Sequence, residues 1–264
     1  MVDTAGRART AERAARRGAR VATRRFRTEL AVETKDGPTD YVTDADRAAE
    51  AAVLDTIGEA YPGDRIIAEE RTGPEPIPDA GPVWVVDPID GTSNFVRGSP
   101  VWATSVAAVV DGETVAAATV MPALGDAYIA DADTVYRNDD PVAVSECTDC
   151  SRAVVCPTIW WPADRSDDYA AVATAIVTRF ADLRRVGSAQ ATLALVAAGA
   201  VEGAVAGVRA HPWDTVAGVH LVRTAGGRVT DPDGGVWHPD STGLVASNGH
   251  LHADVAAVLG GGRG

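Results

Sequence analysis

The chain has 264 residues, of which 46% are hydrophobic, and its 24 basic and 37 acidic side chains give a formal net charge of −13. This length is enough for a substantial core, and the acidic balance argues against nucleic acid or an anionic membrane as the main partner, because both attract clustered positive charge. No apolar run is long enough for a membrane span and no secretory leader is visible, so we expect a cytoplasmic protein.

The N-terminal part is expected to be helical. Residues 8 to 34 place Ala22, Phe26 and Leu30 at four-residue spacing, which predicts an amphipathic helix. The many arginines on its other faces are interpreted as a solvated surface lying against an acidic body. A second helix is expected from Thr43 until Tyr61-Pro62-Gly63 stops it.

Short strands follow and then alternate with helices. The expected strands are 65–69, 83–86, 105–110, 114–121 and 126–131. Asp111-Gly112 is a hairpin signal between the third and fourth of them. After Ser166 we expect helices at 166 onward, 189–198, 214–224 and up to 259, with strands at 201–206 and around 228 and 244. This order predicts an α+β fold, one domain with lobes at about 1–150 and 151–264 and a cleft between them.

The three cysteines and the single lysine give information about the cellular environment. Cys147, Cys150 and Cys156 include one C-x-x-C pair, but four ligands or a thioredoxin-like context would be needed for a zinc or redox site. We interpret them as reduced cysteines near a strand. Lys35 is the only lysine in an acid-rich, alanine-rich chain, which suggests either adaptation to high salt or a GC-rich genome.

The stretch VWVVDPIDGTSNF, residues 83–95, runs an apolar strand into two acids. Pro88 holds Asp87 extended and has no N–H for a sheet, so the strand is expected to end there, with Asp90 in the following turn. Gly91 then permits a tight approach. Two carboxylates that repel one another at the carboxyl end of a strand, where α/β proteins bind ligands, predict a hard cation such as Mg²⁺.

Further acids could complete this site. Glu69 and Glu70 end the strand at 65–69, Asp214 begins a helix in HPWDTVAG, and Asp46 lies in the first turn of another helix. Taken singly, each has an ordinary structural explanation: a polar strand exit, an N-cap, or an acid that balances a helix dipole. The motifs taken together decide between these interpretations.

The motifs DYVTDAD, AEE, DPIDGTSNF and WDTVAG followed by AGG occur in one order over residues 35–227. This pattern closely resembles the inositol monophosphatase superfamily of metal-dependent phosphatases. The resemblance implies a layered αβαβα sandwich, two to three Mg²⁺ ions per subunit, inhibition by Li⁺, a small-molecule phosphate ester as substrate, and a homodimer. Haloacid-dehalogenase phosphatases match less well, because their D-x-D-G-T acids lie near the N-terminus and a lysine follows them.

The resemblance implies metal ligands residue by residue. A first metal would be bound by Glu69, Asp87 and the carbonyl oxygen of Ile89. A second metal would be bound by Asp87, Asp90 and Asp214. A third, weaker metal would use Glu69.

The resemblance also implies catalytic and phosphate-binding roles. Thr92, hydrogen-bonded to Asp46, would orient and help deprotonate the attacking water, with Glu69 assisting. The backbone N–H groups of Gly91 and Thr92 would receive the phosphate. Lys35 matches a family lysine near the site and could meet the phosphate or a nearby water.

Substrate recognition departs from the family pattern. Inositol-specific members carry a glutamate seven residues before the WD aspartate, where this chain has Gly207. Arg209 and His211 are either solvent-facing or suited to a second phosphate, a pattern similar to archaeal members with dual inositol-phosphatase and fructose-1,6-bisphosphatase activity. The segment that resembles the family's substrate loop, and is expected near the sugar, is Gly187, Ser188 and Ala189.

Two other functions stay open. A 3′-phosphoadenosine 5′-phosphate nucleotidase would share every metal ligand and differ in its loops. A catalytically silent scaffold or regulator would be expected to have lost at least one metal carboxylate, whereas Glu69, Asp87, Asp90 and Asp214 are all present.

Overall fold

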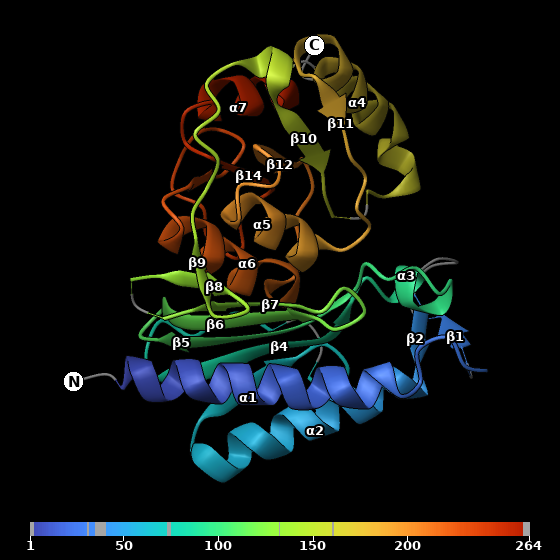
Figure 1. Ribbon diagram of the computed structural model, residues 1–264, viewed down its shortest axis with the longest axis vertical. Helices are drawn as coiled ribbons and strands as arrows, with labels where there is room; N and C mark the ends of the chain where they lie inside the picture. Colours follow the sequence, from blue (N-terminus) through green and yellow to red (C-terminus); the bar gives the residue numbers. More distant parts are fainter. Residues whose placement is uncertain are drawn as a thin grey trace.

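A computed structural model describes residues 3–30, 32–34, 41–72, 75–131, 133–159 and 161–260. Lys35 lies outside the described residues. The chain stacks five layers, in the order helices, sheet, helices, sheet, helices (Figure 1). The predicted α+β class and αβαβα order are therefore confirmed.

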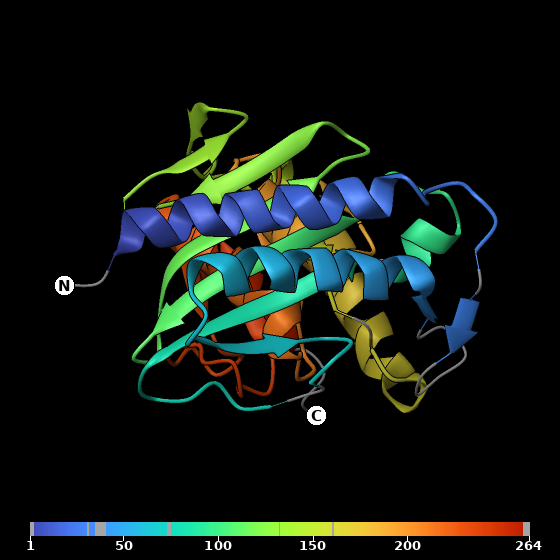
Figure 2. The same cartoon turned by 90° about the horizontal axis from the view of Figure 1, so that it is seen from below.

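The first layer consists of two long helices, α1 (Thr4–Thr23) and α2 (Asp44–Ala60), which lie side by side across one face of a sheet (Figure 2). Alanines such as Ala11, Ala15 and Ala19 form the buried face of α1, and their small side chains allow a close approach to the sheet. At the N-terminal end of the same buried face, Arg7 forms an ion pair with Asp64 (Nη1 to Oδ2, 2.6 Å).

The predicted first helix is wrong in its length, because α1 ends at Thr23. Arg27 has a φ of +60° in the turn that follows. Phe26 leaves the helix, yet its ring centroid lies 5.4 Å from that of Phe95 and 5.5 Å from that of Trp102. Beyond it, β1 (Val32–Thr34) pairs antiparallel with β2 (Tyr41–Thr43). The apolar spacing marked one buried and two half-buried side chains, but not the end of the helix.

The second layer is a seven-stranded sheet in the order β3-β4-β5-β6-β7-β8-β9, in which β3 and β4 are parallel and all other neighbours antiparallel. Its strands are β3 (Arg65–Ala68), β4 (Pro82–Asp90), β5 (Ala103–Val110), β6 (Glu113–Met121), β7 (Asp126–Ala130), β8 (Val135–Arg137) and β9 (Asp140–Val142). Within β4, Val83 and Val85 face the middle helices, and Trp84 and Val86 face α1 and α2, as strand periodicity requires. The hairpin at Asp111-Gly112 is confirmed, with φ of 52° and 79°.

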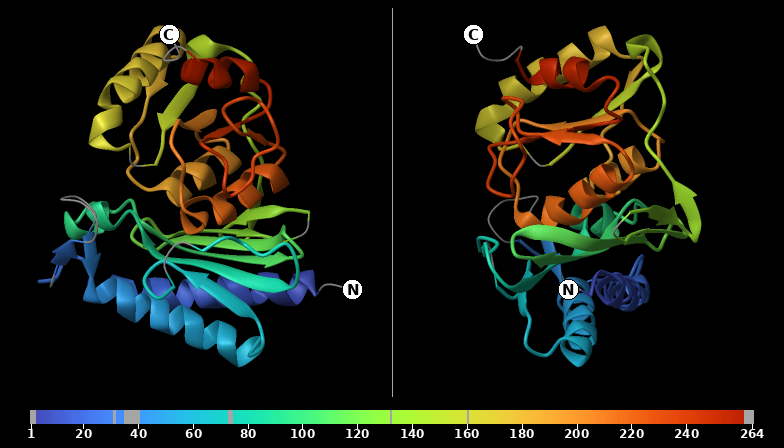
Figure 3. Two further views of the ribbon diagram at one scale, coloured as in Figure 1. Left: turned by 180° about the vertical axis from the view of Figure 1, so that it is seen from behind. Right: turned by 90° about the vertical axis from the view of Figure 1, so that its left-hand side faces the viewer.

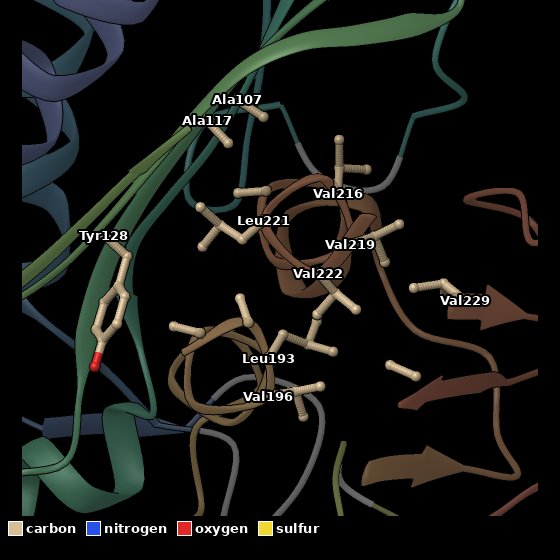
Figure 4. Close-up of a cluster of buried hydrophobic side chains, with 14 of the residues drawn as sticks. Ala107, Ala117, Tyr128, Leu193, Val196, Val216, Val219, Leu221, Val222 and Val229 are labelled. Carbon is tan, nitrogen blue, oxygen red and sulfur yellow. The ribbon is translucent and has the colours of Figure 1, made fainter. Parts of the chain in front are cut away.

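The middle layer consists of α5 (Ala189–Ala197) and α6 (Pro212–Thr224). Figure 4 shows both helices end-on, with Leu193 and Val222 between them and Ala107 of the sheet opposite Leu221. This apolar cluster fixes the two helices against the strand ends from which the acidic side chains project.

The outer layers complete the chain. A five-stranded sheet in the order β11-β10-β12-β14-β13 is covered by two helices, and the layers are seen edge-on in Figure 3. The strands are β10 (Val154–Pro157), β11 (Asp182–Leu183), β12 (Gly203–Ala206), β13 (Arg228–Thr230) and β14 (Leu244–Ser247), and the remaining helices are α3 (Thr92–Val96), α4 (Ser166–Arg179) and α7 (His252–Gly260), with 3₁₀ turns at Cys150–Arg152 and Ala163–Arg165. A lobe boundary near residue 150 stays a prediction.

Two further expectations concern cysteines and membranes. All three cysteines are free thiols, and burial raises the pKa of Cys156 to about 12, which makes this thiol inert. In the part of the chain that the structure describes, none of the helices combines the length and the apolar composition that crossing a bilayer requires.

Candidate active site

Three carboxylates converge where β4 ends against α6. One oxygen each of Asp87, Asp90 and Asp214 lies within 4.8 Å of the others. Asp214 stands in the first turn of α6, where its Oδ2 accepts a hydrogen bond from the backbone N–H of His211 (3.1 Å). Two residues of one strand and one residue more than 120 positions later in the chain thus share one site.

A β-bulge puts Asp87 and Asp90 on the same side of the sheet. Asp87 pairs with Ser105 and Asp90 with Ala103, so three steps along β4 match two along β5. In a regular strand, residues three apart point to opposite faces, and one extra residue corrects this. The expectation that the strand ends at Asp87, with Asp90 in a turn, is wrong: β4 runs to Asp90, because the bulge accommodates a proline without a donor.

Asp87 lies at the centre of the negative charge. Burial is the largest cause that raises the pKa of Asp87 well above its usual value, and the next causes are the charges of Glu69, Asp90, Asp214 and Asp46. Among the described residues, the Oδ1 atom of Asp87 is buried without a hydrogen-bond partner. A buried carboxylate surrounded by other acids is electrostatically unfavourable unless a cation compensates it, and oxygen-only ligands suit Mg²⁺.

Asp90 is held by the N-terminus of α5. Its Oδ2 accepts hydrogen bonds from the Ser188 hydroxyl and the Gln190 backbone N–H (2.7 Å), and its Oδ1 accepts one from the Ala189 backbone N–H (3.1 Å). These donors favour the ionised form. Burial nevertheless outweighs them and raises the pKa of Asp90. A carboxylate offers about four lone-pair directions, so these three bonds leave capacity for a cation.

Glu69 approaches Asp87 from the neighbouring strand. It follows β3 in a turn, and its backbone N–H donates to the carbonyl of Val86 (3.3 Å), the residue directly before Asp87. The backbone of the next residue bonds to a different partner: the Glu70 N–H donates to Glu50 Oε2 (2.7 Å). Of the two adjacent glutamates, Glu69 is the one whose charge is among the causes that raise the pKa of Asp87.

Thr92 and Ile89 form the turn that leaves β4. The hydroxyl of Thr92 donates to the carbonyl of Ile89 (3.0 Å), which leaves that oxygen a second lone pair. Asp46 Oδ2 accepts from the backbone N–H (2.8 Å) and hydroxyl (2.6 Å) of Thr43 in a capping box. The helix-start interpretation of Asp46 is thus realised, and its expected hydrogen bond with Thr92 stays a prediction.

The predicted substrate loop packs directly against the turn after β4. Gly91 has a φ of +89°, and a Cβ added there would lie 3.0 Å from the Ser188 Cβ and 3.1 Å from the carbonyl oxygen of Gly187. Asn94, a motif residue to which sequence reasoning gave no role, joins the two segments, since its amide donates to the carbonyl of Val186 (3.0 Å). Ser188 and Ala189 are both buried beside Asp90, and their contact with a sugar stays a prediction.

The position of the absent family glutamate is closed by an aromatic ring. A Cβ added at Gly207 would lie 2.7 Å from Cη2 of Trp161, so no larger side chain fits there without displacement of the indole. Arg209 is exposed and forms no ion pair within the described ranges. With His211 and His238 it lines a cavity of about 1010 Å³. His211 itself stacks on Trp213, with ring centroids 4.8 Å apart.

Comparisons with known proteins agree with this geometry. A model of the inositol monophosphatase family matches residues 5–260. The chain is 36% identical over 241 residues to "Nus factor SuhB" of Salmonella typhimurium, covering 90% of both chains. It is 35% identical to the inositol-1-monophosphatase of Mesorhizobium japonicum, covering 80% of both chains, and 33% identical to the fructose-1,6-bisphosphatase/inositol-1-monophosphatase of Thermotoga maritima, covering 86% of both.

Solved structures give the same result for the fold. The IMPase of Thermotoga maritima superposes with a TM-score of 0.85 at 32% identity, covering 94% of both chains. The extragenic suppressor protein suhB of Bartonella henselae superposes with a TM-score of 0.87 at 30% identity, covering 95% of this chain and 96% of that one.

Proposed function

The chain belongs to the inositol monophosphatase family and is a phosphoric monoester hydrolase, and from that premise we propose that it hydrolyses the phosphate ester of a small polyol or sugar with Mg²⁺ as cofactor. Inositol 1-phosphate and fructose 1,6-bisphosphate are the proposed substrates. The observation that carries the proposal is the buried Asp87 carboxylate, surrounded by acids and compensated by no cationic side chain among the causes of its raised pKa.

The acidic group fits two or three divalent cations. By resemblance to the family, Glu69, Asp87 and the Ile89 carbonyl would hold the first and Glu69 a weaker third; Asp87, Asp90 and Asp214, which the structure brings together, would hold the second. All of these ligand atoms are oxygens, as Mg²⁺ prefers. When bound, such ions neutralise phosphate oxygens, lower the pKa of water and stabilise a leaving alkoxide.

The chain's own residues would position the phosphate and the water. The backbone N–H groups of Gly91 and Thr92, in the turn after β4, would donate to the phosphate oxygens. Thr92 would orient the attacking water with its hydroxyl, and the proton that the water loses would pass to a carboxylate, either to Asp46 through Thr92 or to Glu69. Attack would be in line with the leaving oxygen, without a phosphoenzyme.

Substrate choice would depend on the residues around Gly207 and Arg209, before the N-terminus of α6. Trp161 stands where a polyol-binding carboxylate would extend from residue 207, which disfavours strict inositol specificity. Arg209 lies exposed beside the α6 N-terminus and offers a planar donor for a second phosphate. The dual-activity relative from Thermotoga maritima supports this assignment. Gly187, Ser188 and Ala189 would lie near the sugar, and Lys35 near the phosphate.

A substrate screen tests the proposal. Released phosphate is measured for inositol 1-phosphate, fructose 1,6-bisphosphate and 3′-phosphoadenosine 5′-phosphate at fixed Mg²⁺, the third substrate representing the nucleotidase alternative. We expect turnover of the first two, and an Asp214→Asn variant that folds but is slower by orders of magnitude. Wild-type turnover in Asp214→Asn would overturn the site, and preference for the third substrate would overturn the substrate class.

A regulatory role is the second candidate function, because a relative at 36% identity is named a Nus factor. The two roles differ in their need for the acids: a binding role would survive Asp214→Asn, whereas hydrolysis would not. Complementation of a strain that lacks its Nus factor SuhB, by wild type and by Asp214→Asn, separates them. Rescue by both proteins supports the regulatory role.

Cellular and assembly properties are also proposed. A homodimer and inhibition by Li⁺ at one metal position are proposed from the family resemblance, and a cytoplasmic location stays a proposal. Adaptation to high salt is proposed as one explanation of the charge of −13, and a GC-rich genome as the other. Sedimentation equilibrium tests the dimer, and Li⁺ titration at fixed Mg²⁺ tests the inhibition.

A further inference from the structure

Gln190 links α5, whose N-terminus holds Asp90 of β4, to α6, which carries Asp214. It is the second residue of α5 and fully buried. Its backbone N–H donates to Oδ2 of Asp90 at 2.7 Å. The main chain of Gln190 therefore orients one carboxylate of the candidate metal site.

The side chain of Gln190 reaches across to α6 on either side of Asp214. Its Nε2 donates to the carbonyl of Trp213 (2.5 Å), the residue directly before that aspartate. Its Oε1 accepts from the backbone N–H of Gly218 (2.7 Å), one helical turn after it. A single buried amide thus uses both ends to hold the turn of α6 from which Asp214 projects.

The helices approach closely enough to make this contact direct. A Cβ added at Gly218 would lie 2.5 Å from the Cβ of Leu193 and 2.9 Å from Oε1 of Gln190. Leu193 and Val222 fill the space between the two helices on the side that Figure 4 shows. Because no gap is left, a shift of α6 relative to α5 would break the bonds of Gln190.

We infer that Gln190 is a positioning residue that fixes Asp214 relative to Asp90 and so sets the affinity of the site for its second divalent cation; this rests on the proposed function for the assignment of that cation. Mg²⁺ demands near-ideal octahedral geometry at about 2.0–2.1 Å, so small displacements of a ligand weaken binding. Groups behind metal ligands typically change metal affinity by about 10–100-fold when removed.

A purely structural role would give a different result. A buried, fully hydrogen-bonded amide also stabilises the core, and its loss leaves the Trp213 carbonyl and the Gly218 N–H unsatisfied. That would lower the melting temperature without a specific change in metal binding. The test therefore compares metal affinity with stability in matched variants.

Calorimetry without substrate measures Mg²⁺ binding in four proteins: wild type, Gln190→Met, Val196→Ala and Asp214→Asn. Met keeps the volume of Gln190 but makes neither bond, and Val196 is an equally buried residue near the other end of α5. We expect Gln190→Met to bind Mg²⁺ at least tenfold more weakly and to need correspondingly more Mg²⁺ for half-maximal turnover, with kcat at saturating Mg²⁺ within about threefold of wild type. Val196→Ala should have a lower melting temperature than wild type and an unchanged affinity for Mg²⁺.

The outcomes separate the inference from the proposed function. If Asp214→Asn weakens Mg²⁺ binding and Gln190→Met does not, the inference is wrong and the metal site stands. If wild type and Asp214→Asn bind Mg²⁺ alike, the proposed site is wrong. If Gln190→Met fails to fold, Gln190→Asn, which is too short to reach both helix positions, replaces it with the same expectation.

Discussion

The Ser188 hydroxyl donates a buried hydrogen bond to the carboxylate of Asp90, across a sequence separation of 98 residues. Ser188 is also the N-cap of α5, where its Oγ accepts from the backbone N–H of Ala191 (3.1 Å). One side chain thus serves the start of a helix and the orientation of a proposed metal ligand.

Ser188→Ala should therefore affect both stability and activity. Loss of the cap is expected to cost about 1 kcal/mol of unfolding free energy, and loss of the bond to Asp90 to lower kcat/KM roughly tenfold. Urea unfolding and steady-state kinetics measure the two effects. Ser151→Ala is the control, since that hydroxyl bonds Asp149 on the surface (2.8 Å) and should leave kcat/KM unchanged.

Asp87→Asn should stabilise the metal-free protein and abolish turnover. Since the folded state raises the pKa of Asp87, the folded protein holds this proton more tightly than the unfolded chain does, and stability falls as pH rises above the usual pKa of an aspartate. Thermal melts with EDTA at pH 8 should show a higher Tm for the variant. Mg²⁺ should raise the Tm of wild type more than that of Asp87→Asn. A lower Tm in EDTA for the variant would contradict this account.

Gly218→Ala should destabilise the contact between α5 and α6. The added methyl would lie 2.5 Å from the Cβ of Leu193, and such overpacking typically costs about 1–3 kcal/mol. Gly58→Ala is the control: Gly58 is an exposed residue within α2, where an added Cβ meets nothing within 4 Å, and the change should stabilise by about 0.5–1 kcal/mol. Urea unfolding of both variants checks the opposite signs.

Arg209→Ala should change substrate preference and leave the chemistry intact. If the guanidinium receives a second phosphate, KM for fructose 1,6-bisphosphate should rise roughly tenfold or more, because a charge-assisted bond is lost. KM for inositol 1-phosphate, which has no second phosphate, should stay the same. Equal changes in KM for both substrates, or no change in either, would show that Arg209 does not bind a second phosphate. Arg152→Ala, also an exposed arginine, should change neither KM.

His252 should make the fold sensitive to mild acid. It is buried between the hydroxyls of Ser247 (2.8 Å) and Thr230 (3.0 Å), and burial, followed by the charge of Arg228, lowers its pKa to about 4. Unfolding allows this imidazole to take up a proton below its usual value near 6.5, so stability should fall as pH drops from about 6.5 toward 4. His252→Asn should be less stable at pH 7.5 but lose less stability between pH 7.5 and 5. Parallel slopes for both proteins would exclude this role.

Residues that belong to short motifs were the most predictable part of the site. Asp87 and Asp90 lie within one strand motif and Asp214 follows a conspicuous tryptophan, so the motifs were enough to predict that these three acids lie together. The same local rules also predicted the hairpin at Asp111, because a two-residue turn is decided by its own backbone.

Long-range contacts were the part that sequence could not supply. Asn94 meets Val186 across 92 residues, and Gln190 meets Trp213 and Gly218 only because two helices pack together. The end of α1 was misplaced because Phe26 keeps the apolar spacing while it packs from a turn instead of a helix. Periodicity records which side chains are buried, and tertiary packing decides which backbone presents them.

The bulge at Pro88 implies that the strand is more sensitive to changes in length than to changes in composition. Conservative substitution of an apolar residue in β4 would alter its packing, but insertion of one residue between Asp87 and Asp90, with the bulge kept, would put the two acids out of step with the alternation and turn one of the two carboxylates toward α1 and α2. The sheet could still form its ladder, while the acids would no longer face one another. Single-residue insertions here should therefore yield a folded protein without a metal site.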